Sequence, residues 1–279
     1  MPSEIFVNYI RRVYNVKARV EKLFRREKMK KTVVMLFLVF MSCLPSILTA
    51  DFRYYAWTYG FMTMLPGNVE IEIYNAYTEP VKGWTGGAYW ERQFEMETGV
   101  MDRWDFSFYM TDTRVVTSSN TNTGEIKMRT RFKLTEKKND FIVDPLLYAE
   151  YRVRFNRLYP DTWEFRGVFA KDIGSFHAVV NLIAEEVLSN TGLTKFFDFG
   201  YAAGASYPVF NEAFRIGVES IGDISAGKYY LGPAISYKGA HIWGAITPAF
   251  GLNSRSDYIK IQAVVGVVFD LTLNPPKEF

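Results

Sequence analysis

The feature that most constrains this chain is an alternation of apolar and polar residues, which recurs from Val69 almost to the C-terminus. In its clearest run, Glu125–Leu134, every second residue is apolar apart from Thr130, and the residues between them are all charged. Successive side chains of a β-strand point to opposite faces, so this pattern predicts strands with two unlike faces. Twelve runs of this kind can be recognised: Val69–Tyr77, Ala88–Thr98, Trp104–Met110, Glu125–Leu134, Leu147–Phe155, Trp163–Ala170, Phe176–Val187, Phe196–Tyr207, Phe214–Ile221, Tyr229–Lys238, His241–Phe250 and Tyr258–Leu271.

The apolar face of these runs is rich in aromatic residues such as Phe106 and Phe108, and Phe, Trp and Tyr make up 17% of the chain. A β-structure in lipid needs such an outer face, and it must close into a barrel because no strand edge can stay unpaired there. We therefore predict an all-β chain that forms a single antiparallel transmembrane β-barrel of about twelve strands in the lipid of the bacterial outer membrane. A soluble exported β-protein is the alternative, since antiparallel sheets with one solvated face also alternate.

A positively charged start and an apolar run precede the strands. Met29-Lys30-Lys31 leads into an apolar stretch that ends at Thr49-Ala50, and this order is typical of a secretory signal peptide. We predict a helical signal peptide over residues 29–50, cleavage between Ala50 and Asp51, export by the Sec machinery and insertion by the barrel-assembly machinery. Residues 1–28 are either a basic N-terminal extension or a start-site artefact upstream of Met29.

Two other interpretations of this leader stay open. An uncleaved transmembrane helix needs about 20 apolar residues, and Pro45 with its polar neighbours weakens that interpretation. The segment Phe40–Cys43 resembles a lipoprotein cleavage box, in which Cys43 would be lipidated. The alternative is that Cys43 belongs to a discarded peptide.

Charge is distributed unevenly along the chain. The first 50 residues hold ten Lys and Arg against three Asp and Glu, so the remaining 23 basic and 27 acidic residues give the rest a balance of −4. A nucleic-acid footprint needs a basic patch, so no nucleic-acid partner is expected. One Cys and two His argue against a disulfide framework and a zinc cluster, and no cofactor or metal ion is predicted.

The barrel is assigned to residues 69–279, and residues 51–68 to an N-terminal segment in the lumen or at the periplasmic rim. Charges on neighbouring strands of the inner face lie within pairing distance, so we expect cross-strand ion pairs in the lumen. These pairs either impose a transverse field on a narrow pore or fill the lumen as a rigid network. The predicted lumen charges are acidic on the early strands, basic on the fourth and mixed beyond it: Glu70, Glu72, Glu91, Glu95, Glu97, Asp105, Lys127, Arg129, Arg131, Lys133, Glu150, Arg152, Arg154, Glu164 and Arg166.

Two segments carry a motif pair. Leu65–Glu72 reads LPGNVEIE and Glu97–Trp104 reads ETGVMDRW, which resembles the LPxGxxExE … GxxDRxxL pattern of uncharacterised Gram-negative outer-membrane β-barrel proteins. Met101 stands where that pattern usually has Thr. The resemblance covers roughly residues 59–108, with a weaker likeness in 232–250, and it implies the fold and the compartment only.

The leading functional hypothesis is a narrow channel or specific porin for small polar solutes, not an enzyme. The runner-up is a plugged structural or surface-binding barrel without transport. A barrel lipid hydrolase is the third hypothesis, since His177 lies close to Ser175. The sequence lacks the Gly-x-Ser-x-Gly elbow of many serine hydrolases, so we interpret His177 as a lumen histidine bonded to its neighbours.

Overall fold

The computed structural model describes residues 52–81, 87–116, 121–156, 159–188, 196–209 and 212–271. The predicted extension, the signal peptide, its cleavage site at Ala50 and Asp51, and Cys43 all lie outside these residues. Within the described ranges, no helix is long and apolar enough to cross a membrane.

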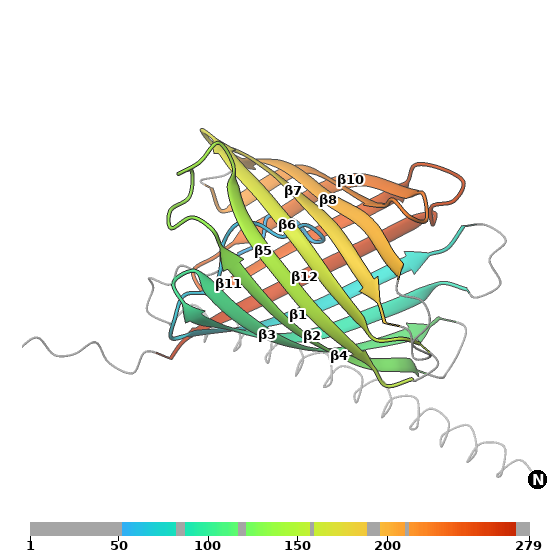
Figure 1. Ribbon diagram of the computed structural model, residues 1–279. Helices are drawn as coiled ribbons and strands as arrows, with labels where there is room; N and C mark the ends of the chain where they lie inside the picture. The colour runs from blue at the N-terminus through green and yellow to red at the C-terminus, as the bar shows by residue number, and fades with distance from the viewer. Residues whose placement is uncertain are drawn as a thin grey trace, which may run out of the picture. The chain divides into compact units, whose positions relative to one another are not determined.

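Twelve strands make up the described structure, and they fall where the alternation predicted them (Figure 1). Each strand has ten to fourteen residues, which suits the length that a tilted strand needs to cross a bilayer. The strands are β1 (Asn68–Glu79), β2 (Tyr89–Met101), β3 (Trp104–Val115), β4 (Thr121–Lys133), β5 (Asp144–Arg154), β6 (Thr162–Ile173), β7 (Phe176–Val187), β8 (Phe196–Val209), β9 (Phe214–Asp223), β10 (Lys228–Lys238), β11 (Ile242–Gly251) and β12 (Ile259–Asp270).

The strands form one closed antiparallel barrel in which each strand pairs with its sequence neighbours and β1 pairs with β12. The closing seam runs from Asn68 opposite Asp270 to Glu79 opposite Ile259, without a register shift. Closure leaves no sheet edge, as a sheet in lipid requires. The prediction of a single antiparallel barrel of about twelve strands is therefore confirmed.

The two ends of the barrel differ in the length of their connections. At the end where β1 starts and β12 finishes, three connections are very short, 102–103, 174–175 and 239–241, and one, 134–143, is long. The turn at Gly174 uses a positive φ of 59°, which glycine adopts readily. The opposite end carries longer connections such as 80–88 and 155–161. Outer-membrane barrels have short periplasmic turns, so the end with both termini of the barrel is the periplasmic end.

One predicted strand differs in extent from the structure. The strand predicted over Glu125–Leu134 begins earlier in the structure, because β4 starts at Thr121, so the outer connection before it is shorter than the predicted strand implied. The backbone from Thr121 onward continues the ladder with β3, with a register shift near Asp112 and Thr113.

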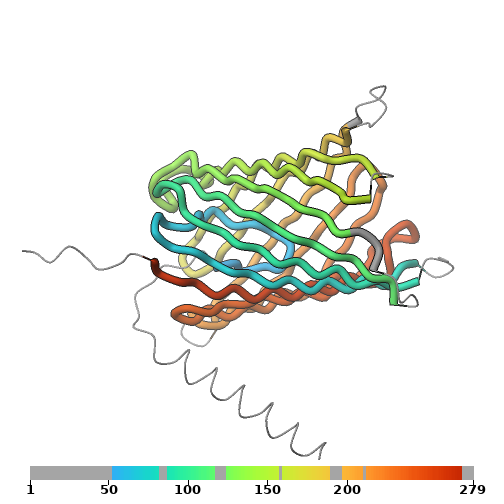
Figure 2. Tube along the Cα trace, turned by 90° about the horizontal axis from the view of Figure 1, so that it is seen from below, coloured from blue at the N-terminus to red at the C-terminus, as the bar shows by residue number. Residues whose placement is uncertain are grey.

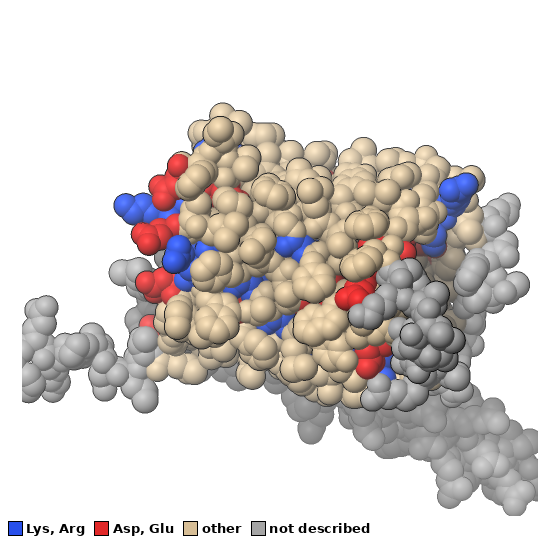
Figure 3. All heavy atoms as spheres, viewed as in Figure 1, with Lys and Arg blue, Asp and Glu red and all other residues tan. Residues whose placement is uncertain are grey.

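The outer surface of the wall is apolar, and the inner surface carries the charged side chains together with small and apolar ones. Along β3, Phe106 is 40% exposed and Met110 is 54% exposed, whereas Asp105 and Ser107, on either side of Phe106, are fully buried. Figure 3 shows one side of the wall as a mostly uncharged surface. Exposed apolar side chains around a whole closed barrel can only be accommodated by lipid, which places the chain in the outer membrane as predicted.

Candidate functional site: the occupied lumen

The lumen of the barrel is occupied by the chain's own N-terminal segment. Residues 52–64, which we call the plug, lie between opposite walls of the barrel (Figure 2). Plug residues Tyr55, Tyr59, Phe61 and Met64 are at most 6% exposed. The isolated bridge between Pro66 and Gly99 then leads the chain into β1 at the periplasmic end. The segment that the sequence left undecided between lumen and rim therefore lies inside the lumen.

A single buried carboxylate holds the tip of the plug. Glu219 of β9 accepts hydrogen bonds from the backbone N–H groups of Ala56, Trp57 and Thr58, at 3.2, 2.8 and 2.6 Å. The Thr58 hydroxyl donates a fourth bond of 2.7 Å to the same carboxylate. Three successive N–H groups around an anion form a backbone nest, and this one satisfies plug amides that have no strand partner.

Amide side chains of the wall take up further backbone groups of the plug. Asn181 of β7 accepts from Tyr59 N at 2.8 Å and donates to Tyr59 O at 2.9 Å. Gln262 of β12 donates to the carbonyl of Ala56 at 2.5 Å. These side chains come from strands on different sides of the barrel, so the plug is fixed across the lumen and not to one wall alone.

His177 takes part in the same attachment. The Tyr55 hydroxyl lies 3.0 Å from His177 Nδ1 and 3.0 Å from Ser206 Oγ. His177 is 3% exposed and faces the lumen, so lipid cannot reach it. The position matches the interpretation of a lumen histidine bonded to its neighbours and offers no support for a lipid hydrolase.

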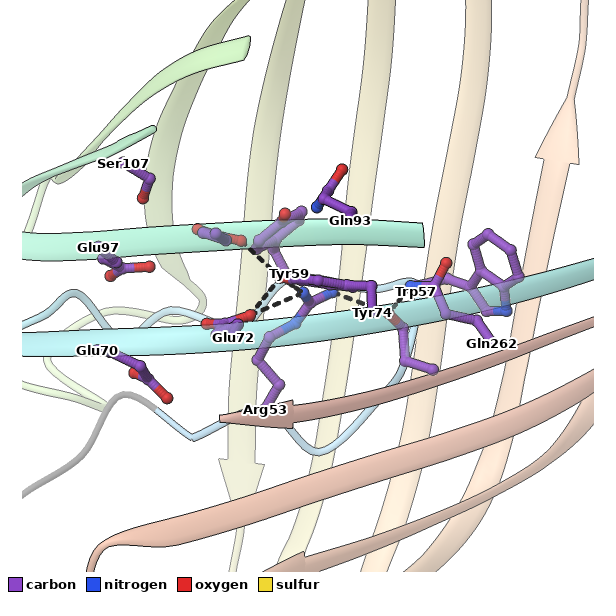
Figure 4. A network of polar contacts seen from close by, with 12 residues as sticks. Arg53, Trp57, Tyr59, Glu70, Glu72, Tyr74, Gln93, Glu97, Ser107 and Gln262 are labelled. Carbon is purple, nitrogen blue, oxygen red and sulfur yellow. Dashed lines mark hydrogen bonds and ion pairs between the residues drawn. The ribbon is translucent and has the colours of Figure 1, made fainter. Parts of the chain in front are cut away.

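Two like-charged pairs face each other on the first two strands. Glu72 of β1 lies directly opposite Glu95 of β2, and Glu70 opposite Glu97. Directly opposed like charges destabilise a sheet, so this arrangement requires positive charge nearby. The plug provides part of that charge, because its Arg53 lies 4.0 Å from Glu72 and donates a hydrogen bond of 2.7 Å to the Tyr74 hydroxyl (Figure 4).

Arginines of β4 pair with Glu95, Glu97 and Asp105, and the Trp243 indole donates to Glu70. Arg129 lies 2.9 Å from Glu95 and also contacts Glu97, while Arg131 lies 2.6 Å from Asp105. Glu72, Glu95 and Glu97 have carboxylate oxygens within 4.8 Å of one another, a spacing that could suit a cation. Arg129 already supplies positive charge at Glu95 and Glu97, so we assign the cluster to an ion-pair network and not to a metal site.

The plug residue Tyr59 sits among the guanidinium groups of this network. Its ring centroid lies 4.1 Å from the guanidinium carbon of Arg53, 4.9 Å from that of Arg166, 5.1 Å from that of Arg129 and 5.7 Å from that of Arg131. A cation near an aromatic face is stabilised by about 0.5–2 kcal/mol. Tyr59 therefore joins the plug to the basic part of the wall without adding a charge.

Two small cavities remain on the side of the plug toward the longer loops. One has a volume of about 200 Å³ and is bordered by Glu91, Arg152 and Arg166, and the other, of about 230 Å³, is bordered by Tyr230 and Lys260. Trp57 of the plug borders both. Its Nε1 atom is buried and has no hydrogen-bond partner among the described residues. A polar cavity of this size has room for several waters or one small polar solute.

The charged residues proposed for the lumen alternate with lipid-exposed residues, and the structure places them on the inner side of the wall. Arg129, Arg131, Glu95, Glu97 and Asp105 meet in the network described above. A second group lies nearer the outer end, where Arg152 and Arg154 approach Glu125 at 3.7 and 3.5 Å. Glu125 was not among the proposed lumen residues, although it shares their strand face.

The residues that attach the plug were missed in the sequence. They are Arg53 and Tyr59 on the plug, and Asn181, Glu219 and Gln262 on the wall. One signal existed for Glu219, since it is the only acidic residue between Ala213 and Gly222. Apart from Arg215, the lumen positions of β9 around it are small or apolar, and a buried acid needs a partner. Nothing in the local pattern showed that the partner would be a backbone segment 160 positions earlier.

Comparisons with known proteins support the fold. No model of a known protein family matches the chain, and no curated protein matches it in sequence. Among solved structures, a KdgM porin in complex with disordered oligogalacturonate is similar with a TM-score of 0.51 and 7% identity, over 72% of this chain and 99% of that one. An outer membrane channel from Pseudomonas putida F1 has a TM-score of 0.52 and 8% identity, over 75% of this chain and 98% of that one. The chain therefore has the fold of an outer-membrane β-barrel.

Proposed function

We propose that this protein is a narrow outer-membrane channel for small polar solutes, closed in this conformation by its N-terminal plug. The observation that carries the proposal is the way the plug is joined to the barrel. It contacts the wall through side chains and takes no part in the strand ladder, apart from the bridge at Pro66 that follows it. The plug could therefore leave the lumen without breaking an inter-strand hydrogen bond.

The polar groups at the tip of the plug support this proposal, although Tyr55, Tyr59 and Phe61 also pack against apolar wall residues such as Leu146 and Val179. A lumen that only had to be filled could be packed with apolar side chains, and buried ion pairs often contribute less stability than such packing. Here the plug ends below polar cavities bordered by Arg152, Arg166 and Lys260. A small polar solute entering between the longer loops would meet donors and acceptors before it met the plug.

The proteins of similar fold add support of a weaker kind. One is described as a porin and the other as an outer membrane channel, but identities of 7% and 8% relate only the folds. The same fold hosts other functions, so transport by this chain rests on its own lumen.

The alternative is a barrel that is permanently plugged and serves a structural or surface-binding role. The four hydrogen bonds at Glu219 favour it, because a buried carboxylate left without those donors is unfavourable by several kcal/mol. The two functions differ in one measurable property, which is whether the plug ever leaves the lumen under conditions that preserve the barrel.

Single-channel recording in planar bilayers tests the proposal. The chain with its own plug should show rare, brief openings, and a variant in which residues 54–62 are replaced by a Gly/Ser linker of equal length should conduct persistently. Heat-modifiable migration on gels would show that the barrel of the variant is intact. A variant with an intact barrel and no conductance would contradict the channel and leave the plugged barrel as the function.

A further inference from the structure

An ion pair on the outer surface of the barrel faces lipid. Arg92 of β2 and Asp112 of β3 are cross-strand partners on the outward face, and their side chains contact each other. The Arg92 side chain is 55% exposed and that of Asp112 is 34% exposed. Arginine has five N–H donors, and among the described residues Asp112 is the partner recorded for them.

The position of this pair in the membrane follows from the register. Tyr77 and Trp90 are partners on the outward face near the outer ends of β1 and β2, with ring centroids 5.0 Å apart. Such aromatic pairs mark the membrane interface in barrels. Arg92 lies one outward position further toward the middle of the barrel than Trp90, so its guanidinium sits at or just inside the outer interface.

An apolar groove begins directly beneath Arg92. It has a volume of about 460 Å³, and its lining includes Ile73, Phe94, Met110 and Phe155. The Phe155 ring folds over Gly124, where an added Cβ would come within 2.9 Å of it. Glycine at this position therefore lets Phe155 form the far side of the groove.

Two cations near the opposite, periplasmic interface contact neutral groups of the protein. Lys171, near the periplasmic end of β6, donates to the carbonyl of Phe141, and Arg103 in the β2–β3 turn lies over the Phe132 ring at 5.4 Å. Arg92 has the one carboxylate of Asp112, whose side chain is about a third exposed, and exposed Arg114 follows Asp112 at the next outward position of β3. Two cations against one carboxylate leave a local excess of positive charge facing the lipid headgroups.

We propose that this groove binds one molecule of a phosphorylated, acylated glycolipid of the outer leaflet. A phosphate of the lipid accepts from the Arg92 guanidinium, which suits that anion by its forked geometry, and one acyl chain lies along Ile73, Phe94 and Met110. Glycolipid is favoured over phospholipid because Arg92 lies toward the end with the longer loops. That end faces the cell exterior, and the outer leaflet there consists of phosphorylated glycolipid in Gram-negative bacteria. This inference is independent of the channel, since the groove lies on the other side of the wall.

Native mass spectrometry of the full barrel in detergent tests the proposal with three lipids. Bis-phosphorylated lipid A should be retained as one molecule for each barrel and should survive dilution that removes phosphatidylglycerol. The same lipid A with its phosphates enzymatically removed should bind at least tenfold more weakly. This comparison uses only the unaltered protein. Equal binding of the phosphate-free form, or of phosphatidylglycerol, would overturn the assignment.

Variants then locate the site. Arg92→Gln should weaken lipid A binding at least tenfold, and Arg92→Lys should fall between Arg92→Gln and the unaltered protein because it keeps the charge and loses the fork. Lys171→Gln is the matched control, since it removes a cation from the opposite interface, and it should leave lipid A binding unchanged. If Arg92→Gln binds lipid A as tightly as the control, the groove is not the site and the proposal fails.

Discussion

Two parts of the inner wall present different kinds of side chain to the plug. Strands β1–β4, the charged wall, present carboxylates and arginines to the lumen. Strands β8–β12, the small-residue wall, present mainly Ala, Gly, Ser, Thr and Val. The inward residues of that second wall include Ala202, Gly204, Ser206, Gly217, Gly232, Ala234, Ser236, Ala245, Thr247, Ala249, Val264, Gly266 and Val268.

The difference shows that the plug supplies what each wall lacks. The charged wall places Glu72 opposite a second carboxylate, and the plug brings Arg53 to within 4.0 Å of Glu72. The small-residue wall lacks volume, and the plug brings aromatic side chains: a Cβ at Gly204 would lie 2.6 Å from the Tyr55 ring. Protein interiors are close-packed, so a wall of small residues implies that something large lies against it.

The largest effect is expected from the charged wall. Arg129→Met should lower the free energy of unfolding by about 3–5 kcal/mol, because it removes the arginine that lies 2.9 Å from buried Glu95 and leaves Glu97 with Arg131 alone. Urea unfolding in lipid vesicles measures this. Arg166→Met is the matched control and should lose less stability. Arg166 borders a cavity, so its partner Glu164 lies next to space that water can enter when the arginine is removed. Equal losses would mean that the network acts through overall charge and not through these pairs.

The small-residue wall should respond to added volume instead. Gly204→Leu should displace Tyr55 and lower stability by about 1–3 kcal/mol, the usual range for overpacking. Ala203→Leu is the matched control, because the adjacent residue points to lipid and has room there. Protease sensitivity of the plug in intact barrels gives a second measurement, and it should rise only for Gly204→Leu. A plug equally protected in both variants would show that the two walls do not differ as described.

The same contrast explains how far the sequence could lead. All twelve strands and their faces were predictable, because lipid outside and polar groups inside impose a period of two on every strand. The ion pair between Arg131 and Asp105 was predictable as a class, since adjacent strands place like faces side by side. The pairs of Arg129 with Glu95 and Glu97 reach across β3 to β2, and the alternation predicts only that all three side chains face the lumen. Each of these inferences uses only residues that are close along the chain or on adjacent strands.

The plug could not be placed from the sequence by this reasoning. Phe52–Met64 alternates too poorly for a strand, and its partners His177, Glu219 and Gln262 are separated from it by most of the barrel. Glycines such as Gly204 are compatible with strand bending as well as with a large neighbour. Only the folded barrel shows that Gly204 lies against the Tyr55 ring, so that the large neighbour explains this glycine.

A third prediction concerns Glu219, which attaches the tip of the plug to the small-residue wall. Glu219→Gln keeps one acceptor oxygen and removes the charge, which roughly halves the strength of the bonds from Trp57 and Thr58. Hydrogen exchange at the amides of residues 56–58 should become roughly tenfold faster, equivalent to about 1.4 kcal/mol. Channel openings, where they occur, should become more frequent to a similar extent.

Glu150→Gln is the matched control for this measurement. Glu150 is also a buried lumen carboxylate, but it accepts from Tyr148 and lies near Arg152, and it has no recorded contact with the plug within the described structure. Its substitution should leave exchange at residues 56–58 unchanged. Faster exchange in both variants would attribute plug mobility to lumen charge in general and not to the nest at Glu219.

The smallest effect separates the ring of Tyr59 from its hydroxyl. Tyr59→Phe loses a contact of 3.3 Å with the Tyr109 hydroxyl, which should lower stability by only about 0.5 kcal/mol. The ring still faces Arg53 at 4.1 Å. Tyr59→Leu removes that aromatic face and leaves the guanidinium groups of Arg53, Arg129 and Arg166 against an aliphatic side chain, so it should lose about 2 kcal/mol more. Urea unfolding of the two variants in the same vesicles measures the difference. Equal losses would mean that the charged wall holds the plug through Arg53 alone, with the Tyr59 ring contributing only volume.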